Sequence, residues 1–172
     1  MIKNDWTSGY VTDIGYIHGY YSELNPLSLK LAFLNAGIKP PEIGNACELG
    51  FGQGLSTNIH AAATVMSWHG NDFNPVQTSY ARELANASSA NVNLVDDTFA
   101  DFVQRTDLPK FDFIGLHGIW SWVSDENRSY IVEFIRKNLN VGGVVYVSYN
   151  TLPGWGAFAP VRYLMTEHAE LI

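Results

Sequence analysis

The stretch ACELGFGQGLS, residues 46–56, decides the fold of this chain. Its first four residues, Ala46–Leu49, form a short, mostly apolar run typical of a buried strand, and an alanine-rich helix is predicted over Leu55–Thr64. Between them, every second position from Gly50 to Gly54 is a glycine, which lets the chain turn sharply and lets a ligand approach the main chain. Taken alone, this turn is also compatible with an ordinary strand-to-helix connection.

Strand and helix patterns alternate around this stretch. Further strands are predicted over Val65–Asn71, Asn91–Val95, Phe111–Leu116 and Val144–Tyr149. Helices are predicted over Pro26–Ala36, from Asn74-Pro75, from Ser124 to a stop at Gly142-Gly143, and over Pro160–Glu170. Five strands separated by helices predict a parallel sheet with helices on both faces, because the crossovers are right-handed. The expected fold is α/β, doubly wound and Rossmann-like, with ligands beyond the carboxyl ends of the strands.

Composition excludes several kinds of function. Seventeen acidic and ten basic residues give the 172-residue chain a formal net charge of −7, which argues against nucleic acid as a partner. A single cysteine, Cys47, allows no internal disulfide, and no Cys/His cluster has the spacing of a metal site. The N-terminus lacks an apolar signal core and no apolar run is long enough for a bilayer. We therefore expect a cytoplasmic protein with no metal and no membrane partner.

Acidic residues accompany three successive strand ends. Glu48, just before the glycines, suits a ligand with positive charge better than a pyrophosphate. Asp72 stands where doubly wound folds place an acid that accepts ribose hydroxyls. After the third strand, Asp96 or Asp97 could accept an adenine amino hydrogen, and Phe99 could pack on the ring. Each acid alone is also consistent with a turn or a helix cap, but together they predict a site for an adenosine-bearing cation.

A nicotinamide dinucleotide is a rival ligand for such a turn. Its fingerprint requires a third glycine or alanine where this chain has Leu55, which weakens that interpretation. A nucleotide-dependent oxidoreductase therefore remains the weaker alternative function.

From Glu48 to Tyr149, the order of these motifs resembles the class I S-adenosylmethionine-dependent methyltransferases. Residues 48–54 look like the glycine motif around the methionine moiety, Asp72 matches the ribose acid, and Asp97, with Asp96 as the alternative, matches the adenine contact. The resemblance implies S-adenosylmethionine as cofactor and a strand order of 3-2-1-4-5. The cofactor-binding residues expected on these grounds are Glu48, Gly50, Phe51, Gly52, Gly54, Asp72, Phe73, Asp96, Asp97, Thr98, Phe99 and His117.

A narrower resemblance rests on LHGIWSWV, residues 116–123, and SYNTLPGW, residues 148–155, together with Gly9-Tyr10 and residues 18–21. These segments look like bacterial methyltransferases related to those with a regulatory domain, a group that includes protein-lysine methyltransferases. No regulatory domain is visible here, so the methyl acceptor is open between a protein lysine and a small metabolite. The residues expected to bind the acceptor are Tyr20, Tyr21, Trp120, Trp122 and Trp155. Core packing is the alternative interpretation of the tryptophans.

Three residues at strand ends are candidates for catalysis. His117 ends the fourth strand and is the best-placed base for deprotonating an amine, although a structural histidine is the common alternative. Tyr149 and Asn150 end the fifth strand and could orient the acceptor through their hydroxyl and amide. The sequence therefore favours methyl transfer to nitrogen or oxygen. A non-catalytic S-adenosylmethionine-binding or partner protein on the same fold is the alternative.

The expected organisation has two parts. Residues 1–44 form an aromatic arm and a helix that packs on the core, and residues 45–172 form the cofactor-binding core. Seven-stranded methyltransferases of this kind add two strands after the fifth, which are missing here. Strand five is then an open edge, and such edges invite pairing. We expect a C-terminally truncated piece, or cover from the arm or another chain, including a homo-oligomer.

Overall fold

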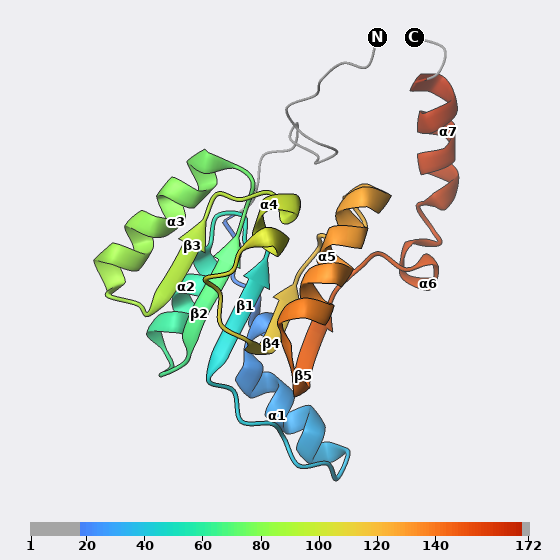
Figure 1. Ribbon diagram of the computed structural model, residues 1–172. Helices are drawn as coiled ribbons and strands as arrows, with labels where there is room; N and C mark the ends of the chain where they lie inside the picture. Colours follow the sequence, from blue (N-terminus) through green and yellow to red (C-terminus); the bar gives the residue numbers. More distant parts are fainter. Residues whose placement is uncertain (1–17, 170–172) are drawn as a thin grey trace.

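The computed structural model describes residues 18–169 (Figure 1). Its elements, in chain order, are the 3-10 helix η1 (Ser22–Leu24), α1 (Pro26–Asn35), β1 (Asn45–Leu49), α2 (Leu55–Ala62), β2 (Ser67–Asn71), α3 (Pro75–Ser88), β3 (Val92–Val95), α4 (Phe99–Gln104), β4 (Phe111–Leu116), α5 (Asp125–Asn138), β5 (Leu139–Val147), α6 (Leu152–Trp155) and α7 (Ala159–Ala169). None of the helices in this part of the chain has both the length and the hydrophobicity needed to cross a bilayer.

The five strands form one parallel sheet with the order β3-β2-β1-β4-β5. In the centre of the sheet, Cys47 of β1 lies opposite His69 of β2 on one side and Ile114 of β4 on the other. The doubly wound α/β fold and the strand order are both confirmed. Strand order reverses direction at β1, so the loops after β1 and β4 diverge there and open the crevice that such folds use for ligands.

Alternating residues of the central strands bury against different helices. Cys47 and Ile114 belong to a cluster with Phe102 of α4 and Phe134 of α5, which cover one face of the sheet (Figure 1). Ala46 and Phe113 belong to a second cluster with Ala61 of α2, and Leu29 of α1 packs against it. Both faces of the centre are thus buried, which explains the nearly continuous apolar sequence of β4.

Helix starts follow the caps expected from the sequence. The side chains of Asn25, Asn74 and Ser124 accept hydrogen bonds from the main-chain N–H of Leu27, Val76 and Asn127, respectively. Proline follows each of the two asparagines at the first helical position, where its missing N–H costs nothing. Local chemistry therefore determines where these three helices begin.

The expected end of α5 is wrong. Gly142-Gly143 do not stop the helix; it ends at Asn138, and β5 already begins at Leu139, where the backbone turns extended. The register of β4 against β5 shifts between Phe111 and Phe113, so residues 140–143 are accommodated as an irregularity within the strand. Gly142 has φ +84°, which suits glycine at such a bulge. The pairing with β4, rather than the glycines, decides this boundary.

The segment beyond Ser148, after β5, is exposed to solvent along its whole described length. Among the described residues, β5 has only β4 as a strand neighbour, and every residue from 149 to 169 is exposed. Figure 1 shows α6 and α7 extending away from the layered body. Residues 1–17, the larger part of the aromatic arm expected before the first helix, lie outside the described residues, so the packing of the arm as a whole, and what covers β5, stay predictions.

Candidate functional site

A cavity of about 340 Å³ opens at the carboxyl ends of β1, β2 and β4. Its lining comes from the ends of these strands, the loops that follow them, the first turns of α2 and α4, and the segment before η1. The lining residues are Gly19, Tyr21, Glu48, Gly50, Phe51, Gly52, Gln53, Gly54, Leu55, Ser56, Asn71, Asp72, Phe73, Phe99, His117, Gly118, Ile119, Trp122 and Val123. The cavity thus lies where the doubly wound topology places ligands.

The glycine loop is shaped by conformations that side chains would prevent. Gly50 and Gly54 have φ +69° and +68°. A Cβ on Gly50 would lie 2.6 Å from Cδ1 of Ile119, and one on Gly54 would lie 2.5 Å from Cβ of Ala81. The loop therefore packs closely against α3 and the β4 loop, and main-chain atoms instead of side chains line this wall of the cavity.

Glu48 lies at the floor of the cavity with only 3% of its surface exposed. The Thr57 hydroxyl donates a hydrogen bond to Oε2 of Glu48. Burial raises the pKa of the Glu48 carboxyl to about 8, an effect that the Thr57 hydrogen bond opposes and the neighbouring Asp72 reinforces. The carboxyl is thus protonated near neutral pH in this buried environment, and a cationic ligand would favour its ionised form.

Asp72 holds the glycine loop in place. Its Oδ2 accepts the Gly52 N–H at 2.9 Å and its Oδ1 accepts the Asn74 N–H at 3.0 Å. Burial raises the pKa of Asp72 to about 6, although both main-chain hydrogen bonds oppose the shift. Each carboxylate oxygen has a second lone pair, so these bonds leave room for ligand hydroxyls.

The neighbouring Asn71, which sequence reasoning did not select, lines the cavity and has one unsatisfied side-chain acceptor among the described residues. Its Nδ2 donates to the main-chain oxygen of Asp97 at 3.0 Å, while its buried Oδ1 has no hydrogen-bond partner in the described part of the chain. Such a buried, unsatisfied oxygen is costly unless a donor reaches it. The strand-end pattern pointed to acids only, which is why an amide was missed.

The acids after β3 are engaged by arginines. Asp96 pairs with Arg82 at 3.1 Å, and Asp97 pairs with Arg105 at 2.9 Å. Neither residue lines the cavity, and Asp96 is about half exposed, with 47% of its side chain accessible. Asp97 is the less exposed of the two, and its main-chain oxygen accepts a hydrogen bond from the side chain of Asn71.

Thr98 and Phe99 have distinct positions. Thr98 caps α4: its Oγ1 accepts the Asp101 N–H at 3.1 Å, and it is not part of the cavity lining. Phe99 is 3% exposed and lines the cavity from the first turn of α4. This helix was not expected from the sequence, because six residues are too few to show helical periodicity.

His117 follows β4 and lines the cavity together with Trp122. Burial lowers the pKa of His117, with a smaller opposing contribution from Glu23. The Tyr21 ring stacks on the imidazole with centroids 4.1 Å apart. A neutral imidazole and two aromatic side chains therefore border the cavity on the β4 side.

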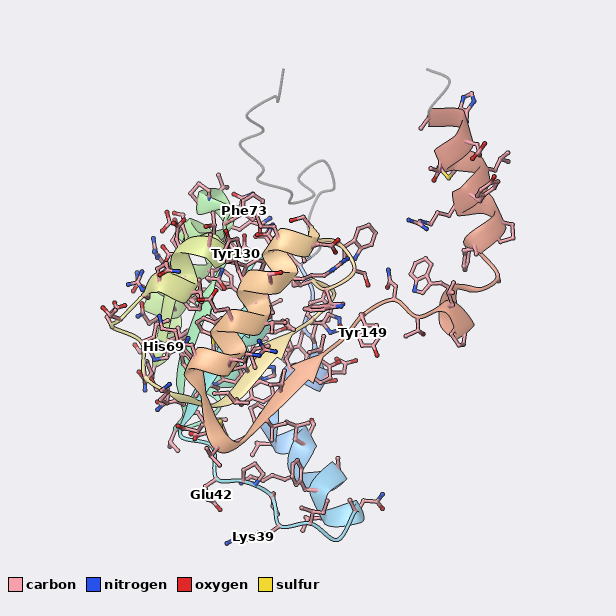
Figure 2. The ribbon with its side chains drawn as sticks, turned by 45° about the vertical axis from the view of Figure 1, so that its right-hand side comes forward. Lys39, Glu42, His69, Phe73, Tyr130 and Tyr149 are labelled. Carbon is pink, nitrogen blue, oxygen red and sulfur yellow. The ribbon has the colours of Figure 1, made fainter. Side chains whose placement is uncertain are left out.

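Several residues expected at the site lie elsewhere. Tyr20 is about half exposed and its ring lies 5.4 Å from that of His60, whereas Trp120 packs against the core and carries Arg128 over its ring. Tyr149, Asn150 and Trp155 are exposed and do not line the cavity. Figure 2 shows Tyr149 on the connection from β5 to α6 and Phe73 near the strand ends.

Within residues 18–169, no group of three or more His, Cys, Asp or Glu side chains is placed to hold a metal ion. The polar groups of the cavity wall are suited to an organic ligand with hydroxyl, amino and cationic groups.

The chain is similar to bacterial proteins over nearly its whole length. It is 47% identical over 170 residues to the protein sll1526 of Synechocystis, covering 96% of this chain and 33% of that protein. It is 34% identical over 174 residues to RP028 of Rickettsia prowazekii, covering 99% of this chain and 68% of that protein. No protein-family model matches the sequence.

Solved structures provide the biochemical context. PKMT2 of Rickettsia typhi in complex with AdoHcy superposes with a TM-score of 0.76 at 30% identity, covering 92% of this chain and 31% of PKMT2. A S-adenosylmethionine-dependent methyltransferase of Thiobacillus denitrificans, 20% identical with a TM-score of 0.53, covers 75% of this chain and 49% of its own length, and shows the shared fold. The chain belongs to the class I S-adenosylmethionine-dependent methyltransferases. It spans about a third of the length of sll1526 and of PKMT2.

The cavity has features that fit the methyltransferase cofactor. The glycine loop contributes Gly50, Gly52 and Gly54 to the cavity wall. The acids Glu48 and Asp72 line the same cavity and are buried. A ligand with a cation and several N–H and O–H groups would satisfy these acids, as S-adenosylmethionine does.

Proposed function

We propose that this chain binds S-adenosylmethionine in the strand-end cavity and transfers its methyl group to a nitrogen or oxygen nucleophile. The observation that carries the proposal is the Gly50–Gly54 loop held by buried Asp72, in a chain of the methyltransferase family. The complex of PKMT2 with AdoHcy supports the same ligand class.

In this proposal, different residues of the cavity contact different parts of the cofactor. The methionine part would lie against Glu48 and the glycine loop, and the ribose hydroxyls would face Asp72. Asn71 and Phe99 would contact the adenine, with Asp97 near them and Asp96 turned toward Arg82. Of the two acids, Asp97 is the one joined to the cavity wall, because Asn71 bonds its carbonyl oxygen, and it is therefore the candidate for an adenine contact.

Bound S-adenosylmethionine supplies an electrophilic methyl group on a positively charged sulfur. Cavity residues would hold a nucleophile in line with that methyl carbon at about 3 to 3.5 Å, and most of the acceleration comes from this alignment. His117 would accept the proton of the nucleophile, before attack for a lysine ammonium, which has no lone pair until it is deprotonated, and during attack for a hydroxyl. The nucleophile lone pair would form the new bond to the methyl carbon, and the carbon–sulfur electron pair would stay on the sulfur, which becomes neutral. The lowered pKa of His117 keeps the imidazole neutral, and therefore able to accept a proton, at neutral pH.

The acceptor class is proposed as a protein lysine or a small metabolite. Tyr21 and Trp122 border the cavity on the side of His117, and their faces can attract a cation and exclude water. A lysine amine has an ordinary pKa of about 10.4, so it needs a base such as His117. The formal net charge of −7 is compatible with a basic acceptor.

Calorimetric titration with S-adenosylhomocysteine tests cofactor binding. Asp72→Asn removes the negative charge and disturbs two main-chain hydrogen bonds, so we expect affinity to fall by about tenfold or more. Asp125→Asn is the matched control, because Asp125 is exposed on α5 and pairs with Arg128. Absence of binding to the unchanged protein would reject the proposal.

Methyl transfer is tested separately with methyl-labelled S-adenosylmethionine. The protein is incubated with lysine-containing peptides and with a metabolite extract, and products are identified by mass spectrometry. Label on a nitrogen or oxygen supports the proposal. Cofactor binding without transfer to any acceptor would instead identify a non-catalytic binding protein.

A further inference from the structure

We propose that Tyr21 and Ser148 are positioning residues for His117: the ring of Tyr21 fixes the plane of the imidazole and the hydroxyl of Ser148 engages its Nδ1, which leaves Nε2 to act on a ligand. This inference rests on the proposed function, in which His117 accepts the proton of the acceptor. It adds a role for two residues that contact the face and the edge of the imidazole, one before η1 and one after β5.

Tyr21 is itself firmly placed. Its main-chain N–H donates to Oγ of Ser56 at 2.8 Å, and its carbonyl oxygen lies 3.3 Å from Nε2 of His60. Three residues later, Leu24 is wholly buried, and a Cβ on Gly115 of β4 would lie 2.8 Å from its Cδ2. The segment is therefore attached to α2 and to β4, and Tyr21 spans the gap between them.

The Tyr21 ring covers one face of the imidazole, and a second aromatic ring lies farther away. The Tyr21 ring is stacked on His117 with centroids 4.1 Å apart and planes 25° apart. The ring of Tyr146, on β5, lies parallel to the imidazole within 2°, with centroids 6.5 Å apart. Stacking between such rings restricts rotation about the side-chain bonds, so the imidazole is held in one plane.

Ser148 fixes the edge of the same ring. Its Oγ accepts the Gly118 N–H at 2.7 Å and lies 3.2 Å from Nδ1 of His117. The main-chain N–H of Ser148 donates to the carbonyl of Leu116 at 3.1 Å, which extends the β4–β5 ladder to the site. One hydrogen bond therefore holds the Ser148 hydroxyl and a second one holds its main chain.

These contacts determine which nitrogen is available. Nδ1 faces the Ser148 hydroxyl, whereas Nε2 has no hydrogen bond to another residue of the described chain. A base whose far nitrogen is oriented by a third group is a recurring arrangement in enzymes that move a proton during catalysis. Ser148 provides that third group, and Tyr21 prevents the ring from turning away.

The imidazole of His117 provides a direct readout that does not depend on knowing the acceptor. Nitrogen-15 and carbon-13 NMR of the ring, recorded against pH on the full chain, reports its pKa and the hydrogen bonding of Nδ1. The His117 signals are assigned by their loss in His117→Gln. The variants are Ser148→Ala, Tyr21→Leu and Tyr21→Phe, with Tyr163→Leu on exposed α7 as the matched aromatic control.

We expect Ser148→Ala to shift the Nδ1 resonance and the pKa of His117, and Tyr21→Leu to shift the ring carbon signals. Tyr21→Phe retains the stacked ring, so its His117 spectrum should equal that of the unchanged protein. The spectrum of Tyr163→Leu should also equal it. Circular dichroism checks that each variant is folded. His117 signals and pKa that are identical in Ser148→Ala and the unchanged protein would overturn the inference.

A second measurement connects positioning to turnover once an acceptor is known. Loss of orientation should lower kcat by about tenfold to 100-fold in Ser148→Ala and Tyr21→Leu, with the KM for S-adenosylmethionine changed less than about threefold. Tyr21→Phe should recover most of kcat. Equal rates of methyl transfer in all variants would overturn the inference without affecting the proposed function. If the NMR shifts are observed but no methyl transfer is found, the proposed function is rejected, while the positioning of His117 by Tyr21 and Ser148 is supported.

Discussion

Two parallel strands of the same sheet, β1 and β5, have opposite surroundings. Four of the five residues of β1 are buried between β2 and β4, whereas none of the nine residues of β5 is fully buried. Residues expected at the site after β1 and β2, such as Gly52 and Asp72, line the cavity, but those expected after β5, Tyr149 and Trp155, do not. The position of the loop after β1 is determined by a strand that is packed on all sides. The position of the segment after β5 is less constrained, because β5 is an edge strand.

The comparison is tested most strongly by removing one aliphatic side chain from each region. Ile114 of β4, beside β1, is wholly buried, so Ile114→Ala should lower the free energy of unfolding by about 2 to 5 kcal/mol. Leu164 of α7 is 69% exposed, so Leu164→Ala should change it by less than about 0.5 kcal/mol. Urea denaturation measures both. A large loss in Leu164→Ala would show that α7 is covered in solution.

Two glycines with positive φ provide the next test. Alanine at Gly54 would place its Cβ 2.5 Å from that of Ala81 in addition to the backbone cost, so we expect a loss of about 2 to 4 kcal/mol. Alanine at Gly142 of β5 meets nothing within 4 Å and should cost about 1 to 2 kcal/mol from φ alone. Thermal melting of the two variants measures these losses of stability. Equal losses would mean that the glycine loop is no more tightly packed than the edge strand β5.

The smallest effect concerns pH and the buried acid of β1. Burial raises the pKa of Glu48 from 4.5 to about 8, so the folded protein keeps a proton that the unfolded chain releases. The free energy of unfolding therefore falls as pH rises within this window, and Glu48→Gln should make the dependence shallower by about 1 kcal/mol per pH unit.

Urea titrations between about pH 6 and about pH 8 measure this slope, above the range in which Asp72, with a pKa of about 6, contributes most. Histidines titrate in both proteins, so the difference between the two slopes isolates Glu48. Parallel slopes would mean that Glu48 is ionised in the folded protein.

Much of the site was predictable because its signals are local. The alternate glycines from Gly50 to Gly54 and the acid Asp72 are read directly from short segments, and the cavity contains them. Asp96 and Asp97 could not be separated in this way, since Arg82 and Arg105, which pair with them, come from α3 and the end of α4. The unsatisfied oxygen of Asn71 also depends on packing that no single segment reveals.

The amino-acid sequence alone determined the alternation of strands and helices, the caps at Asn25, Asn74 and Ser124, and the kind of ligand that the strand ends suit. These depend on nearest neighbours along the chain. Only the tertiary structure decided where β5 begins, and that Tyr21 and Ser148 meet at His117. Such contacts join segments from 31 to nearly 100 positions apart, and pairing and packing, rather than local preference, decide between the alternatives there.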